Sequence, residues 1–256
     1  MPAATSNGLL LSFLTRNMNP YAVNLAVVAG RGDPTSGESL DLSRAEFHGT
    51  AFGMAPGIFV TAGHVYEAAV AAGGNVVLFR MTPDNVNGQV VEDAQVFTHA
   101  DLALLYCPHL QAEILPFRFS PPLNYLEKVV ALGYAFGLTL FAPNHPGVYV
   151  MRGFKGHVVT RSGLTELPGV PPGYEVSFVP PPGLSGAPLI VFAQDVPAVA
   201  GIVLQHHTAE LAGRRMDLGL ALDAEELLTL SSHIVGGSIA EQVFGLQPVP
   251  PRDGSP

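Results

Sequence analysis

The sequence predicts an all-β protein built from two small barrels, with a short helix near its C-terminus. Short apolar runs recur along the chain between Gly, Pro, Asn or Asp residues, which is typical of the strands of a sandwich or barrel. The 28 glycines and 23 prolines among 256 residues interrupt regular structure and leave little room for long helices. A proline-rich crossing at residues 108–124 divides the strands into two sets.

The predicted elements follow in chain order. The first set of strands is expected at residues 22–28, 47–53, 58–62, 75–81, 89–97 and 101–106, and the second at 128–134, 148–152, 156–160, 174–179, 187–192, 198–205 and 216–222. One helix is expected at 65–72 and another at 224–232, where Asp223 as N-cap and Glu226 form a start like a capping box. The corresponding units are an N-terminal extension (1–21), a first barrel (22–107), a linker (108–126), a second barrel with the C-terminal helix (127–234) and a partly disordered tail (235–256).

Composition excludes several classes of function. The net charge of −9 argues against nucleic acid as a partner, because phosphate binding needs clustered Lys and Arg. Cys107 is the one cysteine, so an internal disulfide and a structural zinc site are excluded. His206 and His207 are neighbours that point to opposite faces of a strand, so no metal or other cofactor is expected. The N-terminus lacks a basic segment and a long apolar run, which predicts a cytoplasmic protein without a membrane span.

Three short segments each place one polar residue beside an apolar strand. They are GIFVTAGHV with His64, HADLALLY with Asp101, and PPPGLSGAPLIV with Ser185. Serine hydrolysis needs a hydroxyl, an imidazole that takes its proton, and a carboxylate that orients the imidazole. The segments supply one of each in the order His, Asp, Ser, which differs from the order in subtilisins and in α/β-hydrolases.

These segments are separated by 37 and 84 residues, and they resemble the trypsin-like serine peptidases of the chymotrypsin fold, particularly the protease domain of the bacterial high-temperature-requirement type. The motifs ALGYAFG (131–137), AGIVL (200–204) and GLALDAEEL (219–227) extend the resemblance. It implies two six-stranded antiparallel barrels and an endopeptidase that works through an acyl-enzyme. Ser185 would be the nucleophile, His64 the general base, and Asp101 the carboxylate that orients His64. The N–H groups of Gly183 and Ser185 would form the oxyanion hole.

The same resemblance indicates which residues contact a polypeptide substrate. Val179 stands six residues before Ser185, where trypsin-like enzymes that prefer basic side chains carry a carboxylate. Leu204, Gln205 and His206 are the candidates for the other wall of the pocket. A small or apolar residue before the cut bond is predicted, because an unpaired charge would be buried there without compensation.

Two other functions fit the same residues. One is a catalytically latent or silent peptide-binding scaffold of the same fold, and the other is a serine esterase. Leu184 stands where the digestive enzymes carry an Asp, and the chain has no IVGG-like start, so activation through a cleaved N-terminus is not expected. An activating partner or a homo-oligomer stays open.

Overall fold

The computed structural model describes residues 24–31, 41–82, 85–135, 151–162, 172–193, 196–211 and 214–250. The strands are β1 (Asn24–Arg31), β2 (Asp41–Ala55), β3 (Ile58–Ala62), β4 (Asn75–Thr82), β5 (Asn85–Val90), β6 (Asp93–Phe97), β7 (Leu102–Tyr106), β8 (Lys128–Gly133), β9 (Arg152–Ser162), β10 (Gly173–Val176), β11 (Pro188–Ala193), β12 (Val196–Leu211), β13 (Arg214–Asp223), β14 (Ser231–Ser232) and β15 (Gly237–Ser238). The helical segments are α3 (Gly63–Ala71), η2 (Thr98–Ala100), η3 (Ala224–Thr229) and α4 (Ile239–Phe244).

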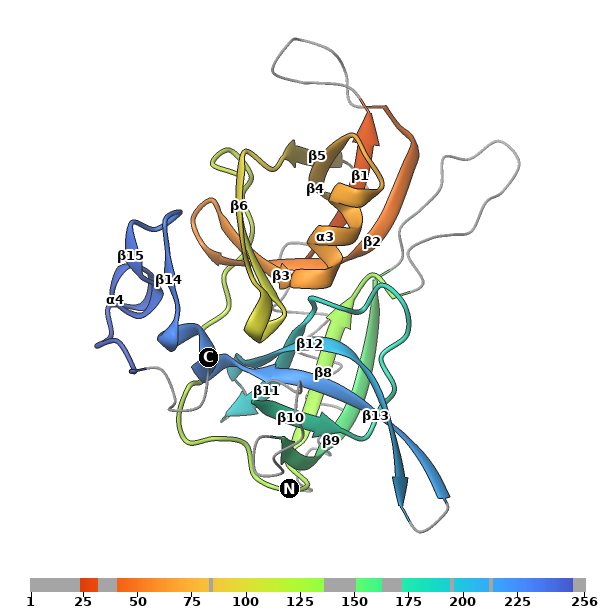
Figure 1. Ribbon diagram of the computed structural model, residues 1–256, viewed down its shortest axis with the longest axis vertical. Coiled ribbons are helices and arrows are strands. Elements are labelled where there is room, and N and C mark those ends of the chain that lie inside the picture. The colour runs from red at the N-terminus through yellow and green to blue at the C-terminus, as the bar shows by residue number, and fades with distance from the viewer. Residues whose placement is uncertain are drawn as a thin grey trace, which may run out of the picture.

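The strands form two β units, one above the other in Figure 1. The upper unit is a curled sheet in the order β5-β4-β1-β2-β3-β7-β6, and the lower is a closed barrel in the order β10-β13-β12-β11-β8-β9. The paired strands of both units run antiparallel, so the predicted all-β double barrel is confirmed.

Two of the predicted strand assignments are wrong. The strand expected at 89–97 is two strands, because β5 pairs with β4 whereas β6 pairs with β7, which gives the first unit seven strands instead of six. The strands expected at 148–152 and 156–160 are replaced by continuous β9, although residues 148–150 lie outside the described part of the chain. Gly156 does not end this strand: a Cβ atom there would lie 2.8 Å from Phe178 Cδ1, so the glycine makes room for the ring.

The two predicted helices are present with different extents. Helix α3 begins at Gly63, directly after β3. The segment expected as a helix at 224–232 is the 3₁₀ helix η3, which ends at Thr229. Asp223 caps it as predicted, since its Oδ1 accepts a hydrogen bond of 3.0 Å from the Glu225 N–H. None of the described helices is long and apolar enough to cross a membrane.

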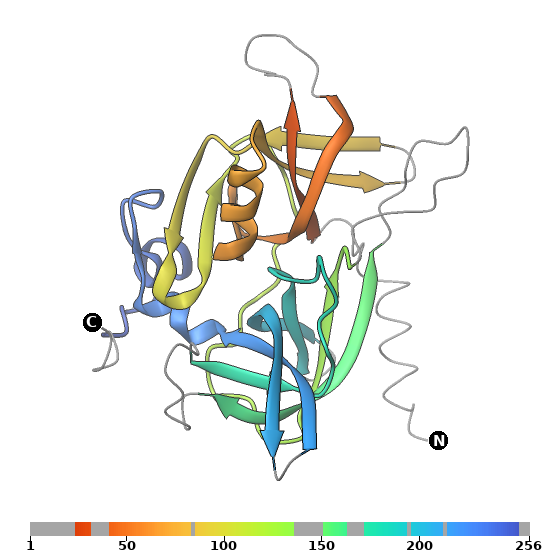
Figure 2. The ribbon, with the colours of Figure 1, turned by 45° about the vertical axis from the view of Figure 1, so that its right-hand side comes forward.

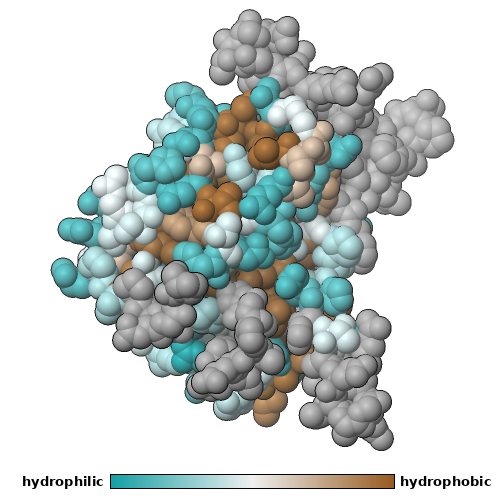
Figure 3. All heavy atoms as spheres, viewed as in Figure 1, coloured by the Kyte–Doolittle hydropathy of each residue, from teal (hydrophilic) through white to brown (hydrophobic). Residues whose placement is uncertain are grey.

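The hydrophobic core is continuous between the two units. One cluster combines buried residues of the first sheet, such as Phe52 and Leu104, with Ile202 and Leu204 of β12. A second cluster fills the barrel around Tyr174. Burial of apolar area shared by both units stabilises one relative orientation of the sheet and the barrel. On the face in Figure 3, hydrophobic side chains lie in small areas between hydrophilic ones.

The chain returns to the first unit after it leaves the barrel. Figures 1 and 2 both show β14, β15 and α4 beside β6. Ile239 and Ala240 of α4 are fully buried, and the His233 N–H donates a hydrogen bond of 3.0 Å to Oε1 of Gln95, a residue of β6. Sequence analysis assigned no element to residues 235–250, because the contacts that join this part of the chain to β6, from His233 to Asp93 and Gln95, reach across 140 and 138 residues.

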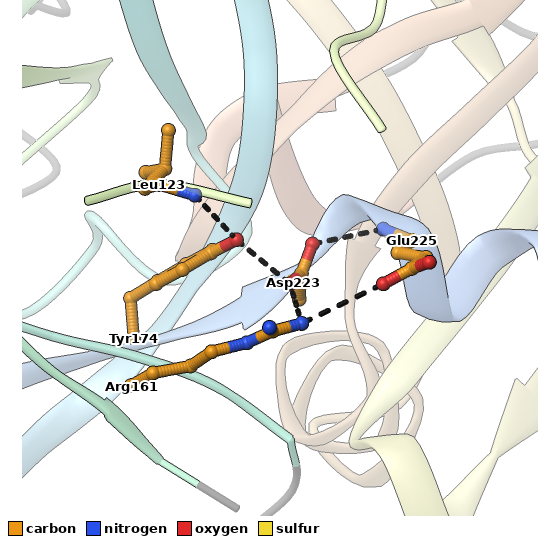
Figure 4. Close-up of polar contacts among 5 residues, drawn as sticks. All are labelled: Leu123, Arg161, Tyr174, Asp223 and Glu225. Carbon is orange, nitrogen blue, oxygen red and sulfur yellow. Dashed lines mark hydrogen bonds and ion pairs between the residues drawn. The ribbon is translucent and has the colours of Figure 1, made fainter. Parts of the chain in front are cut away.

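A polar network links the barrel strands to the interdomain crossing, and Figure 4 shows its hydrogen bonds and ion pairs. The buried Tyr174 hydroxyl donates to Asp223 Oδ2 at 2.7 Å and accepts from the Leu123 N–H at 3.3 Å. Arg161 lies 3.2 Å from Asp223 Oδ2 and 3.5 Å from Glu225 Oε2. Burial and the hydrogen bond to Asp223 raise the pKa of Tyr174 well above its usual value. The network therefore joins the interdomain crossing, β9, β10 and the start of η3.

Candidate active site

His64 and Asp101 are brought together by the pairing of β3 with β7. Ala62 lies opposite Leu102 in this ladder, so the residues that follow β3 and precede β7 meet at the same end of the sheet. His64 is the second residue of α3. Asp101 follows η2 with φ +47°, a left-handed conformation that Asp tolerates better than most residues. Thus a separation of 37 residues in the sequence becomes a direct contact.

The Asp101 carboxylate holds His64 at two points. Its Oδ2 lies 2.8 Å from His64 Nδ1, and its Oδ1 accepts a hydrogen bond of 2.9 Å from the His64 backbone N–H. An ionised carboxylate can only accept, so Nδ1 of the neutral imidazole carries the proton and Nε2 is left as an acceptor. The His64 side chain is 43% exposed, so solvent and a substrate can reach its imidazole ring.

Ser185 follows a tight turn at residues 181–184 that precedes β11. This turn together with Ser185 is called the serine turn below. The Leu184 N–H donates to Pro181 O at 3.1 Å, and Gly183 at the third position of this turn has φ +89°, which defines a type II turn with Pro182 at its second position. A type I turn would need a negative φ at Gly183 and would reverse the peptide between Pro182 and Gly183. Within the described part of the chain, the N–H groups of Gly183 and Ser185 donate to no other group.

The turn contacts the first unit next to His64. The Thr50 N–H of β2 donates to Ser185 O at 2.9 Å. A Cβ atom on Gly49 would lie 2.7 Å from the Val65 side chain and 2.9 Å from Ser185 O. The Gly49 backbone therefore lies between α3 and the serine turn and packs closely against both. Among the described residues, the Ser185 hydroxyl has no hydrogen-bond partner. Hydrogen bonds between catalytic groups are commonly long in unliganded enzymes and shorten when substrate binds.

The four residues predicted to contact substrate differ in their exposure to solvent. Leu204 is 2% exposed and packs in the core, so its side chain faces away from solvent. Gln205 and His206 are exposed on β12. Val179 is 46% exposed. It lies in a segment that approaches β13, because a Cβ atom on Gly219 would be 2.7 Å from Phe178 O and 2.8 Å from Pro180 Cδ.

Cys107 carries a different type of nucleophile, a thiol. Burial, with a smaller contribution from the Glu92 charge, raises the pKa of this thiol to about 12. Its Sγ lies 3.8 Å from Val90 O inside the first unit. Since the thiolate is the reactive form, the raised pKa and the complete burial of Cys107 disfavour it as a nucleophile.

Thr50 is a site residue that sequence analysis missed. It is fully buried, and its hydroxyl contacts the serine turn and the end of β8. A threonine inside the apolar run TAFGMA is a weak signal of such a role, because the partners lie more than 80 residues away.

The fold is similar to those of three solved protease structures. A structure of the HtrA-type protease AlgW, a serine-to-alanine variant with a tripeptide, matches with TM-score 0.54, 16% identity and 81% of this chain covered. The Rv3671c protease in an inactive form matches with TM-score 0.54 and 20% identity over 96% of both chains. A serine-to-alanine mutant of Rv3671c from M. tuberculosis H37Rv matches with TM-score 0.51, 19% identity and 97% of this chain covered.

The fold is that of a trypsin-like serine protease. The chain spans 58% of the AlgW chain and 96% of each Rv3671c chain. No protein-family model matches the sequence, and a comparison with curated proteins also finds no match. The likeness therefore extends over almost the whole chain at the level of the fold.

Proposed function

We propose that this protein is a serine endopeptidase in which His64, Asp101 and Ser185 form the catalytic triad. The observation that carries the proposal is the Asp101 carboxylate, which binds both the ring and the backbone of His64 beside the turn that holds Ser185. The Asp101 contact selects the tautomer whose Nε2 can accept the Ser185 proton. Gly183 and Ser185 then supply the two N–H groups of an oxyanion hole.

The proposed reaction has two steps, acylation and deacylation. Ser185 Oγ attacks the carbonyl carbon of the peptide bond while His64 Nε2 accepts its proton, and the proton then passes to the leaving amine as the C–N bond breaks. In the second step water attacks the acyl carbon while His64 Nε2 accepts its proton, and the proton passes to Ser185 Oγ as the ester C–O bond breaks and the acid product leaves. The positive φ of Gly183 turns its N–H toward the side on which the oxyanion develops, and this stabilises both tetrahedral intermediates.

The proposed substrate is a polypeptide without a required Arg or Lys before the cut bond. Val179 offers no carboxylate at the expected pocket position, and neither of the exposed β12 residues Gln205 and His206 carries one. Digestion of a peptide library tests this preference. Cleavage mainly after Arg or Lys would contradict it.

A fluorophosphonate probe provides the direct test of the nucleophile. We expect labelling of the wild type on the peptide that contains Ser185, located by mass spectrometry, and loss of labelling in Ser185→Ala. Ser231→Ala, which removes an exposed hydroxyl of β14, is the matched control and is expected to label like the wild type. A folded wild type that does not label would instead support a latent or silent scaffold.

The esterase alternative shares every catalytic group with the peptidase. It is separated by comparing kcat/KM on an ester and on the amide of the same acyl group. Turnover of the ester with no turnover of any peptide amide would replace the peptidase by an esterase.

A further inference from the structure

We infer that Thr50 is a positioning residue that holds both donors of the oxyanion hole from the opposite β unit. This role rests on the proposed function. Thr50 lies on β2, in the first unit, and is fully buried. Its backbone and side chain together make four hydrogen bonds, and two of them end on the serine turn.

The two bonds to the turn end on the residues whose N–H groups would bind the oxyanion. The Thr50 hydroxyl donates to Gly183 O at 2.8 Å, and the Thr50 N–H donates to Ser185 O at 2.9 Å. Each bond fixes the peptide group that follows Gly183 or Ser185, and so limits rotation about the ψ angle of that residue. Both residues are therefore held beside β2, while the direction of the Gly183 N–H within the turn is set by the positive φ of Gly183.

The remaining two bonds anchor Thr50 itself. Its hydroxyl accepts from the Tyr134 N–H at 3.0 Å at the end of β8, which uses the second function of the hydroxyl. Its carbonyl accepts from Thr61 Oγ1 at 2.7 Å, and Thr61 lies on β3 three residues before His64. Thr50 thereby connects the strand that ends at the proposed base with the turn that carries the proposed nucleophile.

Close packing around Thr50 leaves no room for water to replace these bonds. A Cβ atom on Gly133 would lie 2.8 Å from the Thr50 hydroxyl oxygen. A Cβ atom on Gly186 would lie 2.0 Å from Thr50 O and 2.2 Å from Thr61 Oγ1. The hydroxyl therefore has no substitute within this contact, and its removal must either leave Gly183 O and the Tyr134 N–H unpaired or move the turn.

The test compares Thr50→Val with Thr50→Ser in the full chain. Valine keeps the shape but removes both hydroxyl bonds, whereas serine keeps them. We expect the kcat for a peptide ester and the fluorophosphonate labelling rate to fall about 10- to 100-fold in Thr50→Val, with KM and the pH profile unchanged, because a loosened oxyanion donor costs less than a deleted one. Thr50→Ser should restore kcat to within about threefold of the wild type.

Thr229→Val is the matched control. It removes a threonine hydroxyl that donates to Glu226 O at 2.8 Å in η3, outside the site, so its kcat should match the wild type. If Thr50→Val does not fold, Thr50→Cys replaces it, because a thiol is only a weak donor and acceptor. A folded Thr50→Val or Thr50→Cys with wild-type kcat, or an equal loss in Thr50→Ser, would overturn the role of Thr50.

The result also distinguishes the role of Thr50 from the proposed function. If the wild type labels on Ser185 and Thr50→Val labels equally fast, the peptidase stands and only the positioning role fails. If the folded wild type does not label at all, the proposed function fails and the positioning role fails with it.

Discussion

Replacement of Gly183 by alanine should abolish most of the activity while leaving the protein folded. Gly183 has φ +89°, a conformation that costs an L-residue about 1 to 2 kcal/mol. Its Cβ would also lie 2.5 Å from Phe47 Cε1 and 2.7 Å from Tyr134 O. Relief of such crowding typically costs about 1 to 3 kcal/mol, so the type II turn loses about 2 to 5 kcal/mol in Gly183→Ala.

The variant can avoid this cost by reversing the peptide between Pro182 and Gly183. A type I turn places alanine at a negative φ and turns its N–H away from the oxyanion site. At about 1.4 kcal/mol for each factor of ten, the type II turn would then be populated in less than roughly one molecule in thirty. Loss of one oxyanion donor lowers kcat by about 10² to 10³. Because up to roughly one molecule in thirty keeps the type II turn, we expect kcat on a peptide ester to fall by about 30- to 1000-fold.

Gly73→Ala is the control that separates strain from collision. Gly73 has φ +80°, close to that of Gly183, but an added Cβ would meet nothing within 4 Å. We expect Gly73→Ala to lower the free energy of unfolding in urea by about 1 to 2 kcal/mol and to leave kcat unchanged. A Gly183→Ala protein with native circular dichroism and a kcat within threefold of the wild type would refute the reasoning about the turn.

Three further predictions concern Asp101, Cys107 and Tyr174. Asp101→Asn keeps an acceptor for the His64 N–H but presents an amide to Nδ1, so kcat should fall by about 10⁴ with little change in KM; steady-state kinetics on one ester substrate would contradict this if the loss were below tenfold. The raised pKa of Cys107 means that the unfolded thiol ionises first, so this contribution to stability is complete below pH 9 and is lost as the pH rises toward about 12. Urea unfolding should show the wild type losing up to about 1.4 kcal/mol per pH unit more than Cys107→Val in that range, and parallel curves would rule this out. Tyr174→Phe removes the acceptor of the buried Leu123 N–H and one donor to Asp223, and should lower the free energy of unfolding by about 1 to 3 kcal/mol without changing kcat; an unchanged urea midpoint would argue against the network as a stabilising feature.

Much of the architecture could be predicted from local patterns. Strand runs such as 58–62 and 101–106 are short, apolar and bounded by turn residues, and the structure places β3 and β7 there. Runs interrupted by glycine or by a charged pair were harder. Residues 89–97 have apolar residues on both sides of Glu92 and Asp93 and suggest one strand, yet β5 and β6 pair with different neighbours, and only the ladder partners decide where such a strand divides.

The candidate site shows the same division. The chemistry of His64, Asp101 and Ser185 follows from residue type and order, which the sequence contains. The contact of His64 with Asp101 depends on the β3–β7 register, and the position of Ser185 depends on the contact of its turn with β2; both join residues far apart in the chain. Leu204 illustrates the limit, because a pocket position inferred from sequence proves to be a core side chain once β12 is packed against the first sheet.

The all-β class, the division into two units and the set of reactive groups can be predicted from the sequence, because they depend on local periodicity and residue chemistry. The seven-strand order of the first unit, the return of the chain to β6 and the four hydrogen bonds of Thr50 become visible only when the chain is folded. Each of these depends on partners supplied from distant parts of the chain, and burial rather than local preference selects them.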